Sequence, residues 1–273
     1  MARTPRVLPG FGLGLSSTLG VMTALLAIPL LAVIAKAATL TWSELWSAVW
    51  TERARHAYAL TVGASLAAAI VDTIIGTLIA WVLVRYDFLG KRLFDSLIDL
   101  PFALPTAVAG LVYSSLYVEN GWLGRFLVPL GVQGAYSRLG IVLVLSFIGL
   151  PFVVRTLQPV LESFDADVEE AAESLGASRL QVFRKVLLPA LRPALLTGFA
   201  LTFARGLGEY GSVVFVSGNM PFRTEIAPVL IVAKLEEFAY AEATAIATVL
   251  LVGSFVMLGV INWLERWSRS HEA

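Results

Sequence analysis

Four ionisable residues lie within long apolar stretches of the sequence: Asp72, Arg155, Arg205 and Glu209. A charged side chain inside a membrane-spanning helix costs about 2.5–3.5 kcal/mol on insertion scales, so such residues are functional candidates. Arg205 and Glu209 are spaced i, i+4, which places them on one face of a helix where they can pair. Alternatively, Arg205 keeps part of its positive charge directed toward a cavity between the helices. The sequence leaves both interpretations open.

Asp72 and Arg155 have simpler structural interpretations. An unpaired Asp72 would repel an anion in such a cavity, so we expect it to pair with an arginine or to be buried against another helix. Arg155 follows Pro151 by one turn near the end of its apolar stretch, and we expect its side chain to extend to the membrane interface. His56 lies among other charged residues and is expected at a solvated surface.

The composition argues against an enzyme. The chain has no cysteine and only His56 and His271, so thiolate chemistry is excluded and a metal site has few ligands. The segment Gly206–Gly211 matches the dinucleotide pattern G-x-G-x-x-G, but it lies in an apolar span rather than between a strand and a helix. We expect Gly208 and Gly211 to permit a helix break or close helix packing instead. With a net charge of zero, the chain has no basic field for nucleic acid.

The elements that position these residues are membrane helices. Of 273 residues, 58% are hydrophobic and 15% charged, and the mean hydropathy is +0.79. A soluble domain is about 45–50% apolar and about 25% charged, so the sequence predicts an all-α integral membrane protein in a lipid bilayer. We expect one transmembrane domain over residues 1–273 with six spans, near 13–35, 58–84, 97–118, 139–160, 194–216 and 241–264.

Three of the apolar segments need comment. The first, 13–35, resembles a signal peptide but exceeds the usual apolar core of about 7–15 residues, so we interpret it as an uncleaved span. The third contains Pro101 and Pro105 and is expected to have an extended or bent start, followed by a helix over Thr106–Tyr117. The amphipathic segment Thr224–Tyr240 is too short to span and is expected at the outer face. The distribution of Lys and Arg, including Arg3 and Arg6, favours both termini in the cytoplasm.

The segment 165–190 is the longest polar stretch on the side predicted to be cytoplasmic. Asp165 or Asp167 can cap a first short helix, which Gly176 ends. Ser178 and Gln181 form a capping-box pattern for a second helix that is expected to stop before Pro189. This second helix is amphipathic, with an apolar stripe at Leu180, Phe183 and Leu187. It is suited to docking in a groove of another protein, although packing against its own bundle is an equally simple interpretation.

The segment also resembles the EAA loop of ABC importer membrane subunits, EAA-x3-G-x9-I-x-L-P. The matching residues are Glu170, Ala171, Ala172, Gly176 and Val186-Leu187-Leu188-Pro189, with valine in place of the usual isoleucine. The resemblance implies a six-span importer permease fold of the type I, molybdate/sulfate-like class, with a coupling helix that docks on a separate ATPase subunit. The docking residues would be Glu170, Ala171, Ala172, Gly176, Ser178, Arg179, Leu180, Phe183 and Pro189.

Three further segments, Asp99–Gly110, Pro151–Glu162 and Gly208–Gly211, are similar to the T-type permease subunit of bacterial sulfate/thiosulfate importers. This resemblance implies an inner-membrane complex with a homologous W-type permease, two ATPase subunits and an extracytoplasmic sulfate-binding protein. ATP and Mg²⁺ would bind the ATPase subunits, and this chain would bind no cofactor. The candidates for the translocation path are Pro105, Thr106, Arg205, Gly208, Glu209 and Gly211.

Two alternatives remain. Molybdate/tungstate importer permeases share the Gly-Glu-Phe/Tyr-Gly element and the fold, so they are the main competing family. A secondary transporter would be expected to show inverted repeats and a substrate site near the midplane, and neither is visible in the sequence. This chain has no phosphate-binding P-loop of its own, because its Gly90-Lys91 step is followed by Arg92 and lacks the upstream glycine.

Overall fold

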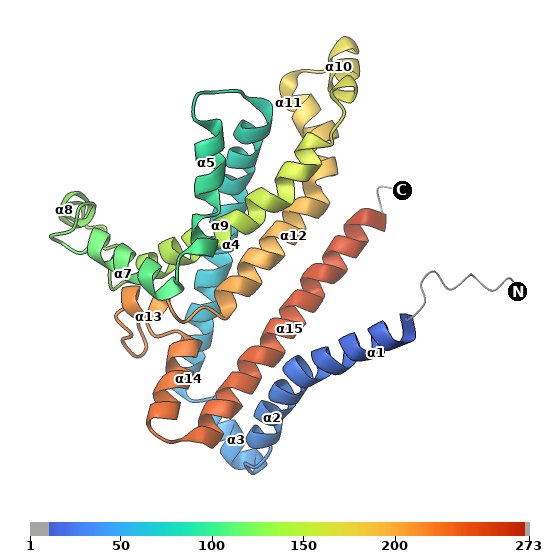
Figure 1. Ribbon diagram of the computed structural model, residues 1–273. Helices are drawn as coiled ribbons and strands as arrows, with labels where there is room; N and C mark the ends of the chain where they lie inside the picture. Colours follow the sequence, from blue (N-terminus) through green and yellow to red (C-terminus); the bar gives the residue numbers. More distant parts are fainter. Residues whose placement is uncertain (1–10, 271–273) are drawn as a thin grey trace, which may run out of the picture.

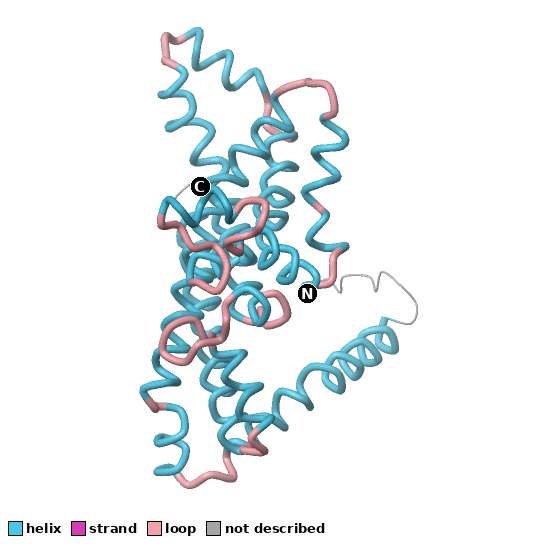
Figure 2. Tube along the Cα trace, turned by 90° about the vertical axis from the view of Figure 1, so that its left-hand side faces the viewer, coloured by secondary structure: helices cyan, strands magenta, loops and turns pink. Residues whose placement is uncertain are grey.

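The computed structural model describes residues 11–270, which form helices and connecting loops without a strand (Figures 1 and 2). Arg3, Arg6 and His271 lie outside the described residues. Within them, five helical segments are long and apolar enough to cross a membrane: Phe11–Ala37, Glu52–Arg85, Arg138–Glu162, Arg179–Leu207 and Tyr240–Ile261.

The α-helices of the described residues fall into a longer and a shorter group. The longer ones are α1 (Phe11–Met22), α2 (Ile28–Ala37), α4 (Glu52–Arg85), α7 (Thr106–Tyr117), α9 (Arg138–Glu162), α12 (Leu188–Leu207), α14 (Ala227–Glu236) and α15 (Tyr240–Ser270). The shorter ones are α3 (Trp42–Val49), α5 (Lys91–Ile98), α6 (Leu100–Ala103), α8 (Gly124–Leu127), α10 (Ala166–Ser174), α11 (Arg179–Val182) and α13 (Val213–Val216). A 3-10 turn covers Val128–Leu130, and π-helical turns cover Thr23–Ala27 and Phe183–Leu187.

The core of the bundle is the packing of α4, α9 and α12 against one another. α4 contributes small buried residues, among them Ala64, Ala68 and Ala80, and α9 contributes branched ones such as Ile148 and Val153. Small side chains on one helix let a neighbouring backbone approach closely, which is how helices associate within a bilayer. The sequence of α4 therefore explains why this long helix lies at the centre of the bundle.

The two ends of the bundle carry different elements (Figure 1). α10 and α11 lie at one end, which we call the loop end, whereas α3 and α14 lie at the opposite end, which we call the α3 end. α14 packs on α15 and α4 and is the helical part of the segment Thr224–Tyr240. Its ten residues are too few to cross a bilayer, which fits the expectation that this segment does not span.

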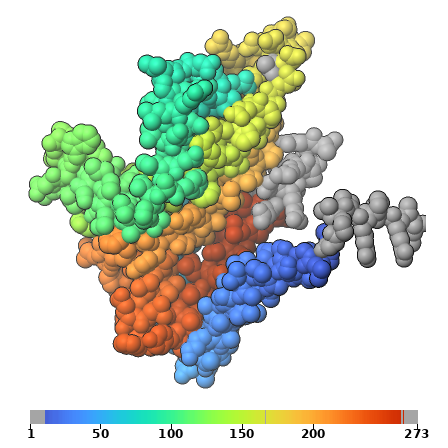
Figure 3. Space-filling view, viewed as in Figure 1, coloured from blue at the N-terminus to red at the C-terminus, as the bar shows by residue number. Residues whose placement is uncertain are grey.

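The N-terminal helices form an arm beside the bundle. α2 packs along α15, and α1 continues away from the body of the molecule (Figures 1 and 3). The apolar part of Phe11–Ala37 buries none of its residues inside this chain. Apart from the contact of α2 with α15, most of the apolar surface of the arm therefore faces surroundings other than the rest of this chain.

Two of the expected spans are not continuous helices. The segment 97–118 divides among α5, α6 and α7, because Pro101 starts the short α6 and the chain is extended at Leu104 and Pro105. α7 has the expected bounds Thr106–Tyr117, and the start of the segment is bent as expected, although most of it is helical rather than extended. The expected span 194–216 is wrong in its second half, because α12 ends at Leu207 and residues 208–212 form a turn before α13.

The helix that begins after Ser178 does not stop before Pro189, so that expectation is also wrong. α11 continues through the π-helical turn Phe183–Leu187 into α12, and Pro189 lies in the first turn of α12. Proline has no N–H to donate to the preceding turn. It is tolerated at position 189 because the wider π-helical turn Phe183–Leu187 interrupts the regular hydrogen bonds there. The loop 165–190 is therefore joined rigidly to a core helix.

Candidate functional site

Arg205 and Glu209 form an ion pair where α12 ends. One guanidinium nitrogen of Arg205 lies 2.5 Å from Glu209 Oε2, which confirms the pairing predicted from their spacing. The backbone N–H and the hydroxyl of Ser212 each donate a hydrogen bond of 2.9 Å to Glu209 Oε1. Glu209 is therefore fully partnered and its side chain is only 3% exposed, whereas 35% of the Arg205 side chain remains exposed. The pair presents its cationic partner to the surroundings.

The turn after α12 packs tightly against α7. A Cβ atom on Gly110 of α7 would overlap the backbone carbonyl of Ser212, and one on Gly211 would overlap Thr106 Oγ1. Only glycine allows these two segments to approach so closely. The close packing brings Thr106 beside the turn that holds Glu209, and Pro105 lies exposed immediately before α7. The candidate residues of segments 105–106 and 205–211 thus gather in one region of the fold.

Asp72 lies in the core of the bundle and is 1% exposed. Among the side chains that the structure describes, no arginine pairs with it, so burial rather than pairing is the observed arrangement. It packs on α9 at Gly149, whose carbonyl oxygen accepts a hydrogen bond of 3.0 Å from Thr202 on α12. Asp72 therefore marks the place where α4, α9 and α12 meet.

Arg155 pairs with two acidic residues, a partnership that the sequence analysis did not predict. Its guanidinium donates two hydrogen bonds to Asp99, at 2.8 and 2.7 Å, and one to Asp95 at 2.6 Å. Gln158 accepts another, at 2.6 Å. The short helices α5 and α6 bring both carboxylates to α9, a proximity that a prediction of one continuous span could not anticipate. The cluster fastens α5 and α6 to the core.

The loop 165–190 has the two predicted short helices. Asp165 caps α10 by accepting a hydrogen bond of 3.1 Å from the Asp167 N–H, and Gly176 follows α10 in the left-handed region with φ of +84°. The Ser178 N–H donates to Gln181 Oε1 at 2.7 Å, as expected for the side chain at this position of a capping box. These local bonds make the loop a structured element.

The docking candidates of the loop differ in exposure. Glu170, Ala171 and Arg179 are exposed, and Leu180 is 58% exposed. Phe183 is half-buried, and Leu187 is buried inside this chain. The predicted apolar stripe therefore lies in two environments. Leu187, at its end, is buried in the bundle, whereas Leu180, at its start, is exposed. Of the other candidates, Gly176 and Ser178 are exposed, and Ala172 and Pro189 are half-buried.

Contacts between the loop and α4 were not anticipated from the sequence. Arg85, the last residue of α4, pairs with Glu169 of α10 and also lies over the ring of Trp81, 5.1 Å from its centroid. Trp81 in turn contacts Phe183 edge to face, with ring centroids 6.4 Å apart. The sequence contained a weak indication of this pair, because basic Arg85 ends a long helix and acidic Glu169 lies near the start of the loop. Only the fold shows that the two side chains meet.

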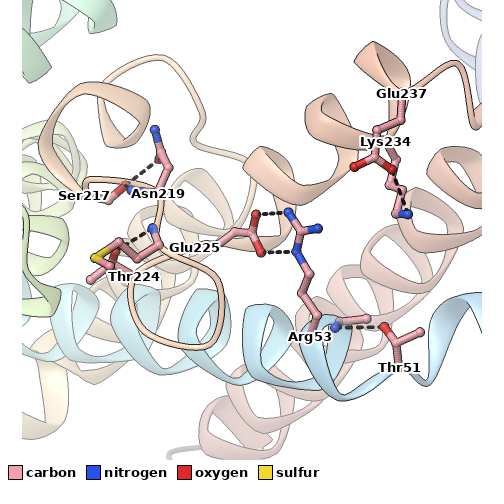
Figure 4. Close-up of polar contacts among 10 residues, drawn as sticks. Thr51, Arg53, Ser217, Asn219, Thr224, Glu225, Lys234 and Glu237 are labelled. Atoms are coloured by element: carbon pink, nitrogen blue, oxygen red, sulfur yellow. Dashed lines mark hydrogen bonds and ion pairs between the residues drawn. The ribbon is translucent and has the colours of Figure 1, made fainter.

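A second group of contacts at the α3 end also escaped the sequence reasoning. Arg53 donates two hydrogen bonds, of 2.8 and 2.7 Å, to Glu225, which is 4% exposed (Figure 4). Arg138 Nε donates to the carbonyl oxygen of Arg223 at 2.9 Å. The loop between α13 and α14 is thereby held against the first turns of α4 and α9.

Nothing in the described part of the chain groups three or more His, Cys, Asp or Glu side chains as metal ligands. The site contains a partly exposed cation, Arg205, beside the tightly packed turn that follows α12. The ordered loop 165–190 is joined to two core helices, α4 and α12.

A family model, curated relatives and solved structures all match this chain. The family model described as "Binding-protein-dependent transport system inner membrane component" matches residues 72–270. This chain belongs to that family. Members of the binding-protein-dependent transport family are permease components of ABC importers, so the chain is an inner-membrane transport permease with several membrane-spanning helices.

Within the binding-protein-dependent transport family, curated relatives are similar over nearly the full length. The sulfate transport system permease protein CysT of Salmonella typhimurium is 46% identical over 260 residues, covering 95% of this chain and 94% of that protein. The CysT protein of Synechococcus elongatus is 52% identical over 247 residues, covering 90% of this chain and 89% of the relative. The resemblance to the T-type permease subunit is thereby confirmed.

Solved structures show the same fold. A bacterial ABC transporter involved in the import of the acidic polysaccharide alginate matches with a TM-score of 0.76 and 17% identity, over 92% of this chain and 93% of that one. The MetNI methionine ABC transporter matches with a TM-score of 0.53 and 18% identity, over 81% of this chain and 98% of that one. The predicted fold class, an all-α type I importer permease, is confirmed.

Proposed function

We propose that this chain is the T-type permease subunit of an ATP-driven sulfate/thiosulfate importer and forms half of its translocation path. The observation that carries the proposal is the identity of 45–52% to CysT proteins of several organisms, over about nine tenths of the chain. Those relatives are named as sulfate transport permeases, which favours sulfate over the molybdate/tungstate alternative. Family membership also argues against a secondary transporter that works without ATP.

The path runs beside the Arg205–Glu209 pair. A dianion such as sulfate needs compensating positive charge when it enters a dry passage. Glu209 accepts two hydrogen bonds from Ser212 and pairs with Arg205, so its carboxylate is buried. The Arg205 side chain remains about one third exposed. Pro105, Thr106, Gly208 and Gly211 surround this point and allow the backbone to bend there.

The loop 165–190 couples the path to ATP hydrolysis. It would dock on a separate ATPase subunit through its exposed residues, among them Glu170, Ala171, Arg179 and Leu180. Ordered short helices move as rigid bodies, whereas a flexible linker would absorb the displacement. ATP and Mg²⁺ would bind the ATPase subunits, so this chain performs no covalent chemistry and binds no cofactor of its own.

The assembly would contain a W-type permease, two ATPase subunits and an extracytoplasmic sulfate-binding protein. The structure of the alginate transporter in complex with a "pentasaccharide-bound periplasmic protein" supports a binding-protein partner for this fold. In the proposed orientation the loop end faces the cytoplasm together with both termini, and the α3 end faces outward in the bacterial inner membrane.

Deletion of the gene in its own host tests the proposal. We expect the deletion strain to lose growth with sulfate as the sole sulfur source and to grow normally with cysteine. Restoring the gene must restore growth on sulfate, and molybdate-dependent enzyme activity must be unchanged in the deletion strain. Normal growth on sulfate, or a loss of molybdate-dependent activity alone, contradicts the sulfate proposal.

A further inference from the structure

A cavity of about 450 Å³ opens at the α3 end between α4 and α9. Along α4 it is lined by His56, Ala59, Leu60, Gly63 and Ala64, and α9 contributes Arg138 and Val142. The lining contains two side chains that can carry positive charge and no carboxylate. A Cβ atom on Gly63 would meet nothing within 4 Å, so this position borders open space.

Arg138 differs from four arginines of the bundle that have a carboxylate partner. Arg53, Arg85, Arg155 and Arg205 each pair with a carboxylate. Among the residues that the structure describes, none places a carboxylate within ion-pair distance of Arg138. Its Nε is nevertheless fixed by the hydrogen bond to the carbonyl oxygen of Arg223. The guanidinium is therefore held at an exposed position without a carboxylate partner among the described residues.

His56 is the second polar group of the cavity. Its ring meets Phe222 edge to face, with centroids 5.8 Å apart, and its Nε2 is 4.0 Å from Glu52, which is a loose contact. Arg138 contacts the same loop one residue further on, at Arg223. The loop 217–226 thus supports both residues at the mouth of the cavity, and the bidentate Arg53–Glu225 pair anchors that loop (Figure 4).

On α4, the residue after the cavity lining contacts α12. Its lining on α4 ends at Ala64, and the next residue, Ser65, packs against Gly206 of α12. Gly206 follows Arg205 directly in the chain. Arg138 and Arg205 therefore lie on two helices, α9 and α12, that both pack against α4.

We propose that this cavity is an entrance site for a tetrahedral oxyanion, held by Arg138 with His56 at its mouth. The site receives the anion before it reaches Arg205. This inference rests on the proposed function for the orientation and for the identity of the anion, but the positive potential of the cavity can be measured without transport.

The absence of cysteine in this chain makes the measurement direct. Gly63→Cys places one thiol at the cavity without displacing a neighbour. In the assembled complex in vesicles, the labelling rate of this chain is compared between a negatively charged and a neutral methanethiosulfonate reagent added from outside. Sulfate at millimolar concentration is then tested as a protecting ligand.

We expect the anionic reagent to be favoured and sulfate to slow its reaction. Arg138→Gln should slow the anionic reagent roughly five- to tenfold, because it removes one full charge close to the thiol, and should leave the neutral reagent unchanged. Arg55→Gln is the matched control. Arg55 is exposed, lies on the same turn of α4 as His56 and does not line the cavity. This variant should change neither rate.

Three results would overturn the inference: no preference for the anionic reagent, a preference that survives Arg138→Gln, or no labelling by the neutral reagent, which would mean that a partner subunit closes the cavity. If the charge preference is present and sulfate protects, but the intact complex imports no sulfate, then the proposed function fails and the anion site stands. If the complex imports sulfate and Arg138→Gln changes neither labelling nor import, the site fails and the function stands.

Discussion

Arg85 ends the central helix α4 and pairs with Glu169 on the first helix of the 165–190 loop. Both side chains are mostly buried, with exposed fractions of 23% and 22%. The same loop continues without interruption into α12. In the proposed coupling, a displacement of the loop would therefore reach two of the three core helices, α12 through the chain itself and α4 through this ion pair.

Breaking the Arg85–Glu169 pair should weaken coupling. We expect Arg85→Gln to keep the ATPase subunits bound but to lower the amount of sulfate imported per ATP hydrolysed, by a factor of about five for a loss of about 1 kcal/mol. The charge-exchanged double variant Arg85→Glu with Glu169→Arg should recover part of the ratio. An unchanged ratio in Arg85→Gln would mean that α4 receives no displacement through this contact.

Gly176 tests the docking role of the loop. Its φ of +84° costs a branched residue about 1–2 kcal/mol, so Gly176→Val should distort the junction between α10 and α11 and reduce co-purification of the ATPase subunits. Gly131→Val is the matched control, since Gly131 has a φ of +80° with nothing within 4 Å in a different loop. Equal retention of the ATPase in both variants would remove the loop from the docking surface.

Arg205 tests the path. The single variant Arg205→Gln would leave the buried Glu209 carboxylate without its cation, which is destabilising by itself. The double variant Arg205→Gln with Glu209→Gln removes both charges and keeps the shapes, so we expect it to assemble and to import sulfate at least tenfold more slowly, a loss of about 1.4 kcal/mol or more. Arg192→Gln, an exposed position on the same helix, serves as the control. Full-rate import by the double variant would exclude Arg205 from the path.

The Asp95–Arg155 contact predicts a dependence of stability on pH. Burial raises the pKa of Asp95, but hydrogen bonds from Arg155 and Gln158 and the charges of Arg155 and Lys91 hold that pKa below its ordinary value of 3.8. A lowered pKa in the folded state stabilises the fold above the ordinary value, and this contribution is lost as the pH falls through the lowered pKa.

Thermal unfolding in detergent checks the sign of this effect. Asp95→Asn should lower the unfolding temperature at pH 7, and its difference from the unsubstituted chain should shrink as the pH falls below about 3.8. Asp87→Asn is the control, because Asp87 is 99% exposed and contributes little through its pair with Lys91. A difference that grows on acidification would contradict the assignment.

The contact between α7 and the turn after α12 predicts intolerance of a single methyl group. In Gly110→Ala the new Cβ would overlap the Ser212 carbonyl, so we expect a loss of about 1–3 kcal/mol of stability and slower import. Gly253→Ala on α15 meets nothing within 4 Å and should change neither property. Thermal unfolding and sulfate import of the two variants, measured side by side, decide the matter.

The long apolar helices and the capped helices of the loop could be predicted because their signals are local. Asp165 and Gly176 act within one turn of chain, and a span needs only a run of apolar residues. The end of α12 at Leu207 could be predicted only in part: Gly208 and Gly211 indicated a helix break or close packing, but the contact of Gly110 with Ser212 depends on the fold.

The candidate site was predictable only in part, because its other components depend on tertiary structure. The Arg205–Glu209 pair follows from i, i+4 spacing, whereas Arg138 reaches its place through a loop 85 residues away in the chain. Arg155 likewise finds Asp99 at a separation of 56 residues. No periodicity in the sequence carries information about such partners.

The most direct measurement is ATP-dependent uptake of radiolabelled sulfate into vesicles that contain this chain, the W-type permease, the ATPase subunits and the binding protein. The account predicts uptake that disappears when this chain alone is omitted and that excess molybdate leaves unchanged. Uptake that persists without this chain, or molybdate uptake by a complex lacking the second permease, would contradict it.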